Sequence, residues 1–152
     1  DTQAPTFTSV PSDLSLECGD DADYGTATAE DACNESSVTV TSVSNDDSCN
    51  EVITRTFTAT DACGNSATAS QTIIITDTTA PEFTFVPGSI EHSCDESPAY
   101  GMATASDLCN GATVTVSEEI VSQDACLTVI GREFMAVDAC GNDSYEFQYI
   151  YI

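Results

Sequence analysis

The sequence contains no lysine and no tryptophan, and its only basic side chains besides His92 are Arg55 and Arg132. Against these stand 26 aspartates and glutamates, which give the chain a formal net charge of −24. Proteins that bind nucleic acid or anionic lipid neutralise phosphates with clusters of basic residues, so the composition excludes both partners. Membrane insertion is excluded too, because the longest apolar run, Ile73-Ile74-Ile75, is far below the roughly 20 residues of a spanning helix.

The eight cysteines indicate disulfide bonds and not a metal–thiolate site. Within each half of the chain they stand 14 to 17 residues apart, whereas zinc ligands come in closely spaced pairs that usually include histidine. So high a charge often means disorder, but a hydrophobic content of 41% favours a packed core. We therefore expect a folded, disulfide-linked protein of an extracellular or cell-surface compartment.

The chain is a tandem duplication. Cys18 and Cys94 differ by 76 positions, and Cys63 and Cys140 differ by 77. The same two offsets relate Pro5 to Pro81, Pro11 to Pro87, Gly25 to Gly101, Arg55 to Arg132, and Phe57 to Phe134. The start of the chain, Asp1 to Pro5, is echoed by Asp77 to Pro81, so the repeats are predicted to be residues 1–76 and 77–152.

Each repeat is predicted to consist of β-strands. Between Ile53 and Asp61, one face carries Arg55, Phe57 and Ala59, and every residue on the other face is threonine. Such alternation is typical of a strand with one side in the core and the other in water. No 3.6-residue apolar period persists, and turn-forming clusters separate the strands, as in an Ig-like β-sandwich.

The expected strand order also predicts the disulfides. Following the chain from strand to strand puts Cys18 and Cys49 at one end of the first repeat, and Cys33 and Cys63 at the other. Four cysteines allow three connectivities, and from this geometry we predict four bridges: Cys18–Cys49, Cys33–Cys63, Cys94–Cys126 and Cys109–Cys140. Each closes a loop of roughly 30 residues, worth about 3–4 kcal/mol. The same path puts the termini of a repeat at opposite ends, so the repeats are expected to lie end to end.

The string from Ile53 to Asn65 and the linker from Asp77 to Phe83 resemble the Ig-like, hyalin-repeat-related modules of bacterial surface proteins. Those modules are arrayed in adhesins and extracellular filaments of Bacteroidota and other marine bacteria. The resemblance covers nearly the whole chain twice, although the second repeat departs at Gly131 to Asp138. It implies a structural or adhesive role and not catalysis.

Carboxylates gather at the ends of the repeats, which predicts a cation site. The proposed ligands at one end are Asp31, Asp61 and Asn65, matched by Asp107, Asp138 and Asn142, with Asp77 in the linker. Stacked repeats would gather these like charges, and calcium, which prefers oxygen ligands, would relieve the repulsion. Two alternatives stay open: the acids are a solvated surface, or Asp31 and Asp61 form turns beside the cysteines.

Three other features have structural interpretations. Arg55 and Arg132 share the strand face of the core phenylalanines, so each is expected to pair with a carboxylate at the margin of the core. His92 corresponds to Leu16 and is expected to be a tolerated core or rim residue.

Two residues are candidate glycosylation sites. Asn34 begins an Asn-Glu-Ser sequon, and Thr78 lies in an Asp-Thr-Thr string that resembles the O-glycosylation signal of Bacteroidota. The acids recur in both repeats, whereas one active site is not expected to be duplicated, so we predict no enzyme.

The leading hypothesis is a structural tandem-repeat segment, or an end-to-end polymerising subunit, of an extracellular bacterial fibre or adhesin stalk. Disulfides and calcium would stiffen it, and its partners would be neighbouring repeats or identical subunits. The alternative is an adhesion module that binds carbohydrate, ice or a receptor, for which the exposed threonine row from Thr54 to Thr60 is the candidate surface.

Overall fold

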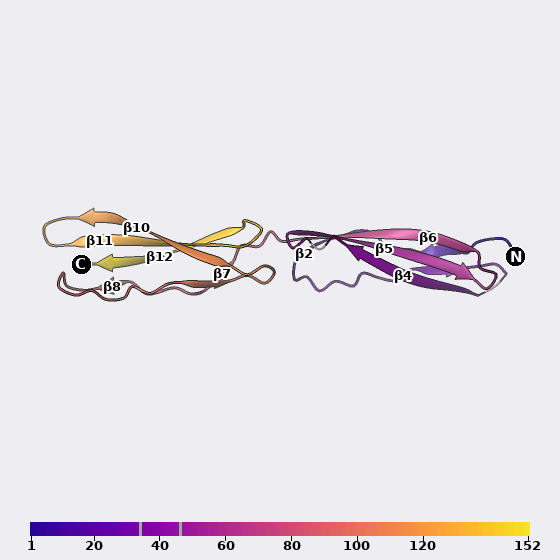
Figure 1. Ribbon diagram of the computed structural model, residues 1–152, viewed down its shortest axis with the longest axis horizontal. Helices are drawn as coiled ribbons and strands as arrows, with labels where there is room; N and C mark the ends of the chain where they lie inside the picture. Colours follow the sequence, from indigo (N-terminus) through magenta and orange to yellow (C-terminus); the bar gives the residue numbers. More distant parts are fainter. Residues whose placement is uncertain (34, 46) are drawn as a thin grey trace. The chain divides into compact units, whose positions relative to one another are not determined.

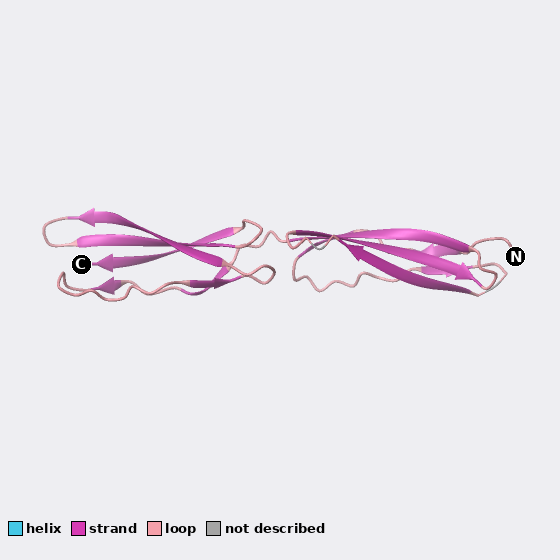
Figure 2. Ribbon diagram, viewed as in Figure 1, coloured by secondary structure: helices cyan, strands magenta, loops and turns pink. Residues whose placement is uncertain are grey.

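The computed structural model describes residues 1–33, 35–45 and 47–152, and every regular element in that part of the chain is a β-strand (Figure 2). The chain divides into two compact units, Asp1–Asp77 and Thr78–Ile152, with the boundary one residue after the predicted one. The described residues include no helix able to cross a membrane. The predicted sequon residue Asn34 lies outside the described residues, and the all-β fold of two tandem sandwich units is confirmed.

The first unit packs a four-stranded sheet and a two-stranded sheet (Figure 1). Its strands are β1 (Thr6–Ser9), β2 (Leu14–Glu17), β3 (Thr28–Glu30), β4 (Ser36–Ser44), β5 (Asn50–Asp61) and β6 (Ser66–Thr76). The larger sheet has the order β2-β6-β5-β4, and β1 pairs with β3 in the smaller one. The long strands β4, β5 and β6 follow one another as antiparallel hairpins, which is where the sequence alternates most regularly.

The second unit repeats this topology. Its strands are β7 (Glu82–Phe85), β8 (Ile90–Glu91), β9 (Thr104–Ser106), β10 (Thr113–Gln123), β11 (Thr128–Val137) and β12 (Asp143–Tyr151). The larger sheet has the order β8-β12-β11-β10, and β7 pairs with β9. One irregularity interrupts the β10–β11 ladder between Ile120 and Ser122.

Burial follows the predicted alternation. The buried apolar residues are Phe57, Ala59 and Ile73 in the first unit, and Ala103, Phe134, Ala136 and Ile150 in the second. These are few side chains for units of this size. A small sandwich buries a modest share of its unfolded surface, so polar contacts and cross-links must supply part of the stability.

In each unit, the first strand of the larger sheet lies parallel to the last strand. β2 pairs with β6 from Leu14 opposite Ile73 to Glu17 opposite Thr76, and the ladder is extended by the Cys18 N–H, which donates to the Thr76 carbonyl at 2.7 Å. β8 pairs in the same sense with β12. Each unit therefore enters and leaves its main sheet on neighbouring strands that run in one direction.

Candidate functional site

The hairpin between β5 and β6 is organised by a buried carboxylate. Asp61 Oδ1 accepts the backbone N–H groups of Cys63 at 2.9 Å and Asn65 at 2.8 Å, and Asp61 Oδ2 accepts the Asn65 side-chain amide at 2.8 Å. The hydrogen bond from the Asn65 side chain, helped by backbone N–H donors, outweighs burial and lowers the pKa of Asp61 below its ordinary value. Both oxygens of this predicted metal ligand therefore hold the turn.

The second unit repeats this turn. Asp138 accepts the N–H groups of Cys140 at 2.7 Å and Asn142 at 2.9 Å, and the Asn142 amide at 2.8 Å. Burial raises the pKa of Asp138, but the hydrogen bonds from Asn142, Cys140 and Gly141 together outweigh burial and lower it. The turn-forming alternative that the sequence left open therefore describes Asp61 and Asp138.

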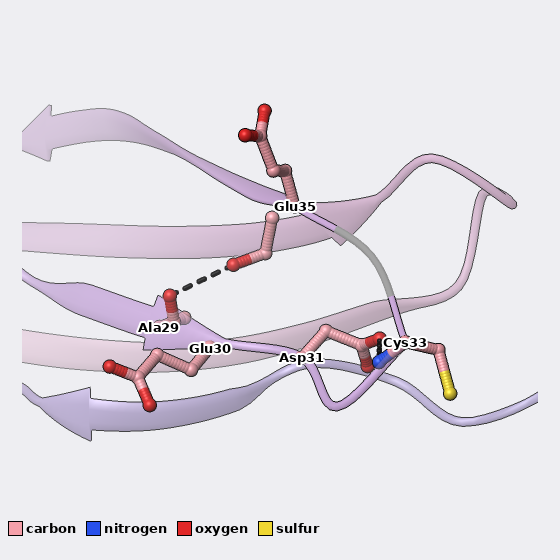
Figure 3. A pocket seen from close by; sticks show the side chains of 6 residues that line it. Ala29, Glu30, Asp31, Cys33 and Glu35 are labelled. Atoms are coloured by element: carbon pink, nitrogen blue, oxygen red, sulfur yellow. Dashed lines mark hydrogen bonds between the residues drawn. The ribbon is translucent and has the colours of Figure 1, made fainter.

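Asp31 lies in a different setting. The carboxylate oxygens of Asp1 and Asp31 and the sulfur of Cys33 all lie within 4.8 Å of one another, and the Asn65 amide reaches the Asp1 carbonyl at 3.4 Å. The Asp31 carboxylate accepts a hydrogen bond from the Cys33 N–H at 2.9 Å. Figure 3 shows that the carboxylates of Glu30 and Glu35 point away from Asp31. A hollow of about 570 Å³ borders this turn.

The Asp1–Asp31 pair can hold calcium, although only Asp31 was a predicted ligand. Calcium binds carboxylate oxygens at about 2.3–2.6 Å, so a single ion could bridge two oxygens that are this close. The Cys33 thiol is a soft ligand that favours other metals. These residues would therefore hold calcium through the two carboxylates and need further oxygens, such as waters, to complete its coordination.

The remaining predicted ligands have identified backbone roles. Asp77 is buried, and its N–H donates to the Cys49 carbonyl at 3.2 Å. Asp107 accepts the N–H groups of Cys109 at 2.8 Å and Asn110 at 3.1 Å. The Asp107 carboxylate thus stabilises the turn at Cys109, whereas the contact shown for Asp77 is made by its backbone.

Four cysteines are disulfide-bonded: Cys18, Cys49, Cys109 and Cys140. All four belong to two of the predicted bridges, Cys18–Cys49 and Cys109–Cys140. Backbone hydrogen bonds join Cys18 to Thr76 and Cys49 to Asp77. In the second unit, the Asn110 amide lies 3.1 Å from the Cys140 sulfur. The bonded residues thus have neighbours within their own units, and the pairing itself stays a prediction.

The other two predicted bridges, Cys33–Cys63 and Cys94–Cys126, are not formed in this structure. Cys33, Cys94 and Cys126 are free, and all four residues are exposed. The Cys33 sulfur lies near Asp1 and Asp31, while Cys63 lies in the β5–β6 hairpin.

An arginine pins a distant loop to the larger sheet of the first unit. Arg55 Nη1 donates to the carbonyls of Tyr24 at 2.8 Å and Gly25 at 3.1 Å, and to Gln71 Oε1 at 2.7 Å. The Gln71 amide in turn donates to the Ser12 carbonyl at 2.7 Å and to Tyr24. Gly25 has a φ of +72°, and a Cβ there would meet the Pro11 ring at 3.1 Å, so this loop position requires glycine.

The second unit contains the same pin. Arg132 Nη1 donates to Gln148 Oε1 at 2.6 Å and to the carbonyls of Tyr100 and Gly101. Its Nε also pairs with Glu118 at 2.8 Å, so the expected carboxylate partner is confirmed for Arg132. Arg55 has carbonyl and amide partners instead.

Sequence reasoning missed the glutamines of these pins. Gln71 and Gln148 are 77 positions apart, the offset that relates the arginines, and both are almost completely buried. Glutamine at equivalent strand positions of both repeats was the signal available in the sequence, and buried polar side chains of this kind are normally hydrogen-bonded.

His92 is half-buried at the rim of its unit, as expected. Its Nε2 lies 3.2 Å from the Tyr100 hydroxyl, and the two rings stack at 5.9 Å. Thr78, the predicted O-glycosylation site, is exposed.

Residues 6–75 match the family model described as a HYR-like domain with 4 cysteines. The match runs from the start of β1 almost to the end of β6 and includes Cys18, Cys33, Cys49 and Cys63. A comparison with curated proteins found no match.

Solved cadherin structures are similar at low identity. Drosophila N-cadherin EC1-4 has 15% identity, with 99% of this chain and 49% of that chain covered and a TM-score of 0.45. Human Protocadherin-24 EC1-2 has 13% identity, with 97% of both chains covered and a TM-score of 0.42. This chain therefore spans about half the length of the N-cadherin structure. Together, the family match and the duplicated sandwich support an Ig-like repeat module of the extracellular adhesion or structural kind.

Proposed function

We propose that this chain is a load-bearing tandem-repeat segment of an extracellular bacterial fibre or adhesin stalk. The observation that carries the proposal is the parallel pairing of the first and last strands of the larger sheet, β2 with β6 and β8 with β12. In a fibre, tension would enter a unit near its first strand and leave it after its last strand.

Parallel pairing makes a unit resist such tension. When two neighbouring parallel strands are pulled in opposite directions along their length, the hydrogen bonds between them are oriented across the direction of the force. The bonds from Leu14 to Cys18 must then break together, whereas a hairpin pulled from its open end loses them singly. We therefore expect each unit to unfold at high force.

Cross-links and calcium would add stiffness. The disulfide-bonded Cys18 continues directly from the parallel ladder, so a bridge from it to Cys49 would restrain the strand under load. Calcium bound by Asp1 and Asp31 would hold the start of the chain against the β3–β4 turn. The sequence repeats this acid pair as Asp77 and Asp107, as an array of units joined end to end would require.

Single-molecule pulling on the full chain tests the mechanical role. Leu14→Ala truncates a half-buried side chain in the parallel ladder, and Val38→Ala makes a comparable change in β4. Each change should lower the free energy of unfolding by about 1–3 kcal/mol. Only Leu14→Ala should also lower the unfolding force of the first unit. Extension without a force peak, or equal force losses in both variants, would overturn the load-bearing role.

A calcium titration tests the metal separately. Calcium should raise the melting temperature, magnesium should do so less, and Asp31→Asn should remove the increase. Asp21→Asn makes the same charge change at an exposed residue away from that turn and should keep it. If calcium does not raise the melting temperature, the proposed calcium site is refuted, whereas the result of the pulling experiment is unaffected.

A further inference from the structure

The two units present different chemistry on the outer face of the larger sheet. In the first unit, equivalent outward positions on β5 and β6 carry threonine and serine: Thr54, Thr56, Ser70 and Thr72. In the second unit, the residues 77 positions later are Gly131, Glu133, Phe147 and Tyr149. Phe147 and Tyr149 are 52% and 40% exposed, so two aromatic residues of one strand lie partly in water.

These residues form a groove whose floor is a glycine. Gly131 on β11 lies opposite Glu119 of β10 on one side and opposite Tyr149 of β12 on the other. A Cβ at position 131 would lie only 2.8 Å from the Val121 side chain, so Val121 packs closely against the glycine and a larger residue there would displace it. The groove has a volume of about 350 Å³. Its principal lining residues are Glu119, Val121, Gly131, Glu133, Phe147 and Tyr149.

The groove combines aromatic rings with three carboxylates, and Glu118 is the one that pairs with Arg132. Glu119 and Glu133 line it, and neither forms an ion pair or a hydrogen bond with a described side chain. The nearby Arg132 is 5% exposed and bonds to Glu118 and to Gln148. Charge complementarity therefore calls for a cation from outside.

We propose that this groove binds an arginine or lysine side chain of a different protein. A cation in the groove would lie near the aromatic side chains of β12 and the carboxylates of Glu119 and Glu133. Attraction to the ring faces and to the acids would then act together. An extended segment that carries one basic residue between small neighbours matches the groove.

A second copy of this chain does not supply such a side chain. The sequence has no lysine, and the guanidinium groups of Arg55 and Arg132 bond to loop carbonyls and glutamines. The occupant is therefore not a second copy of this chain, and we expect a segment of different sequence.

Chemical-shift mapping on the full isotope-labelled chain tests this proposal. The probe is the capped peptide Gly-Ser-Arg-Ser-Gly, and its control contains citrulline, which keeps the shape of arginine without the charge. The arginine peptide should produce saturable shifts at the amides of Gly131 and Phe147, and the citrulline peptide should bind about tenfold more weakly.

Residues from the first unit provide variants of unchanged net charge. Phe147→Ser combined with Tyr149→Thr should weaken binding of the arginine peptide about tenfold. The control, Tyr145→Thr, removes an exposed ring on the same strand outside the groove and should leave affinity within about twofold. If the double variant does not fold, Glu119→Gln with Glu133→Gln should weaken binding, whereas Glu82→Gln on β7 should not.

Three results would overturn the proposal. The first is a set of shifts spread over the acidic surface of both units, because that means binding to net charge alone. The second is full affinity in the folded double variant. The third is a neutral trisaccharide that shifts the groove resonances when the arginine peptide does not.

Discussion

Replacing Gln148 by leucine removes the centre of the second unit's arginine pin. Gln148 is completely buried, and its Oε1 accepts a hydrogen bond from Arg132 Nη1 at 2.6 Å. Its Nε2 donates to the carbonyls of Gly88 at 2.7 Å and Tyr100 at 3.1 Å. Leucine has a similar volume but restores none of these three bonds, so the change isolates the polar contacts.

The expected loss of stability follows from these partners. A hydrogen bond to a charged group contributes about 1.5–3 kcal/mol, and each neutral bond contributes about 0.5–1.5 kcal/mol. Burial of the leucine side chain recovers about 1–2 kcal/mol of the sum. The net loss should therefore be about 3 kcal/mol, which lowers the melting temperature of a domain of this size by about 12–24 °C.

Scanning calorimetry on the full chain is the assay, because it resolves a unit that melts early. Gln148→Leu should shift the melting of the second unit, and Gln71→Leu should do the same in the first. The control, Gln123→Leu, makes the same substitution at an exposed position, where the change should stay within about 0.5 kcal/mol. A loss below about 1 kcal/mol for Gln148→Leu would refute the pin as a main source of stability.

Peptide mapping without reductant should recover Cys18 linked to Cys49, and Cys109 linked to Cys140. A disulfide between residues of different units would contradict this pairing. Gly101→Ala should destabilise by about 1–2 kcal/mol in urea unfolding, because φ is +75° there and the Pro87 ring lies 3.2 Å from the new Cβ; unchanged stability would contradict the need for glycine at this position. Asp61→Asn should destabilise the protein at neutral pH but match the wild type in strong acid. The folded pKa of Asp61 lies below 3.8, so its contribution is present above that pH and is lost as the pH falls through the folded pKa. A wild-type advantage that persists in acid would contradict this assignment.

The strands and the duplication could be predicted because both depend on local, repeated patterns. The alternation from Ile53 to Asp61 places Phe57 and Ala59 in the core, since a period of two determines which face each side chain occupies. The offsets of 76 and 77 residues predicted two similar units before any contact was known. Neither inference needed to know which distant residues meet.

The details of the site depend on long-range contacts, and here the predictions failed or stayed open. Seven oxygen-bearing residues were assigned to calcium, but Asp61 and Asp138 use their oxygens to hold turns. Asp1 was not assigned, although the structure brings it to Asp31. A carboxylate that can accept its own turn's N–H groups has a local alternative to a metal, and sequence spacing does not distinguish the two.

The same reasoning explains why the glutamines of the pins were missed. Gln71 bonds to Ser12 and Tyr24, which lie far from it in the sequence. Nothing near Gln71 indicates that it is buried, because its neighbours on β6 continue an ordinary alternation. Only the comparison between the repeats identifies it.

The duplication also separates what the fold needs from what distinguishes the units. Arginine, glutamine and the loop glycine stand at equivalent positions in both pins, because each loop is held by the same bonds. Arg132 additionally pairs with Glu118, whereas the cross-strand partner of Arg55 is Ser42, which carries no charge. The outer face differs further, from threonine to a groove of rings and carboxylates. Two copies of one frame thus carry different surfaces, which is how a structural repeat can acquire a binding role without losing its fold.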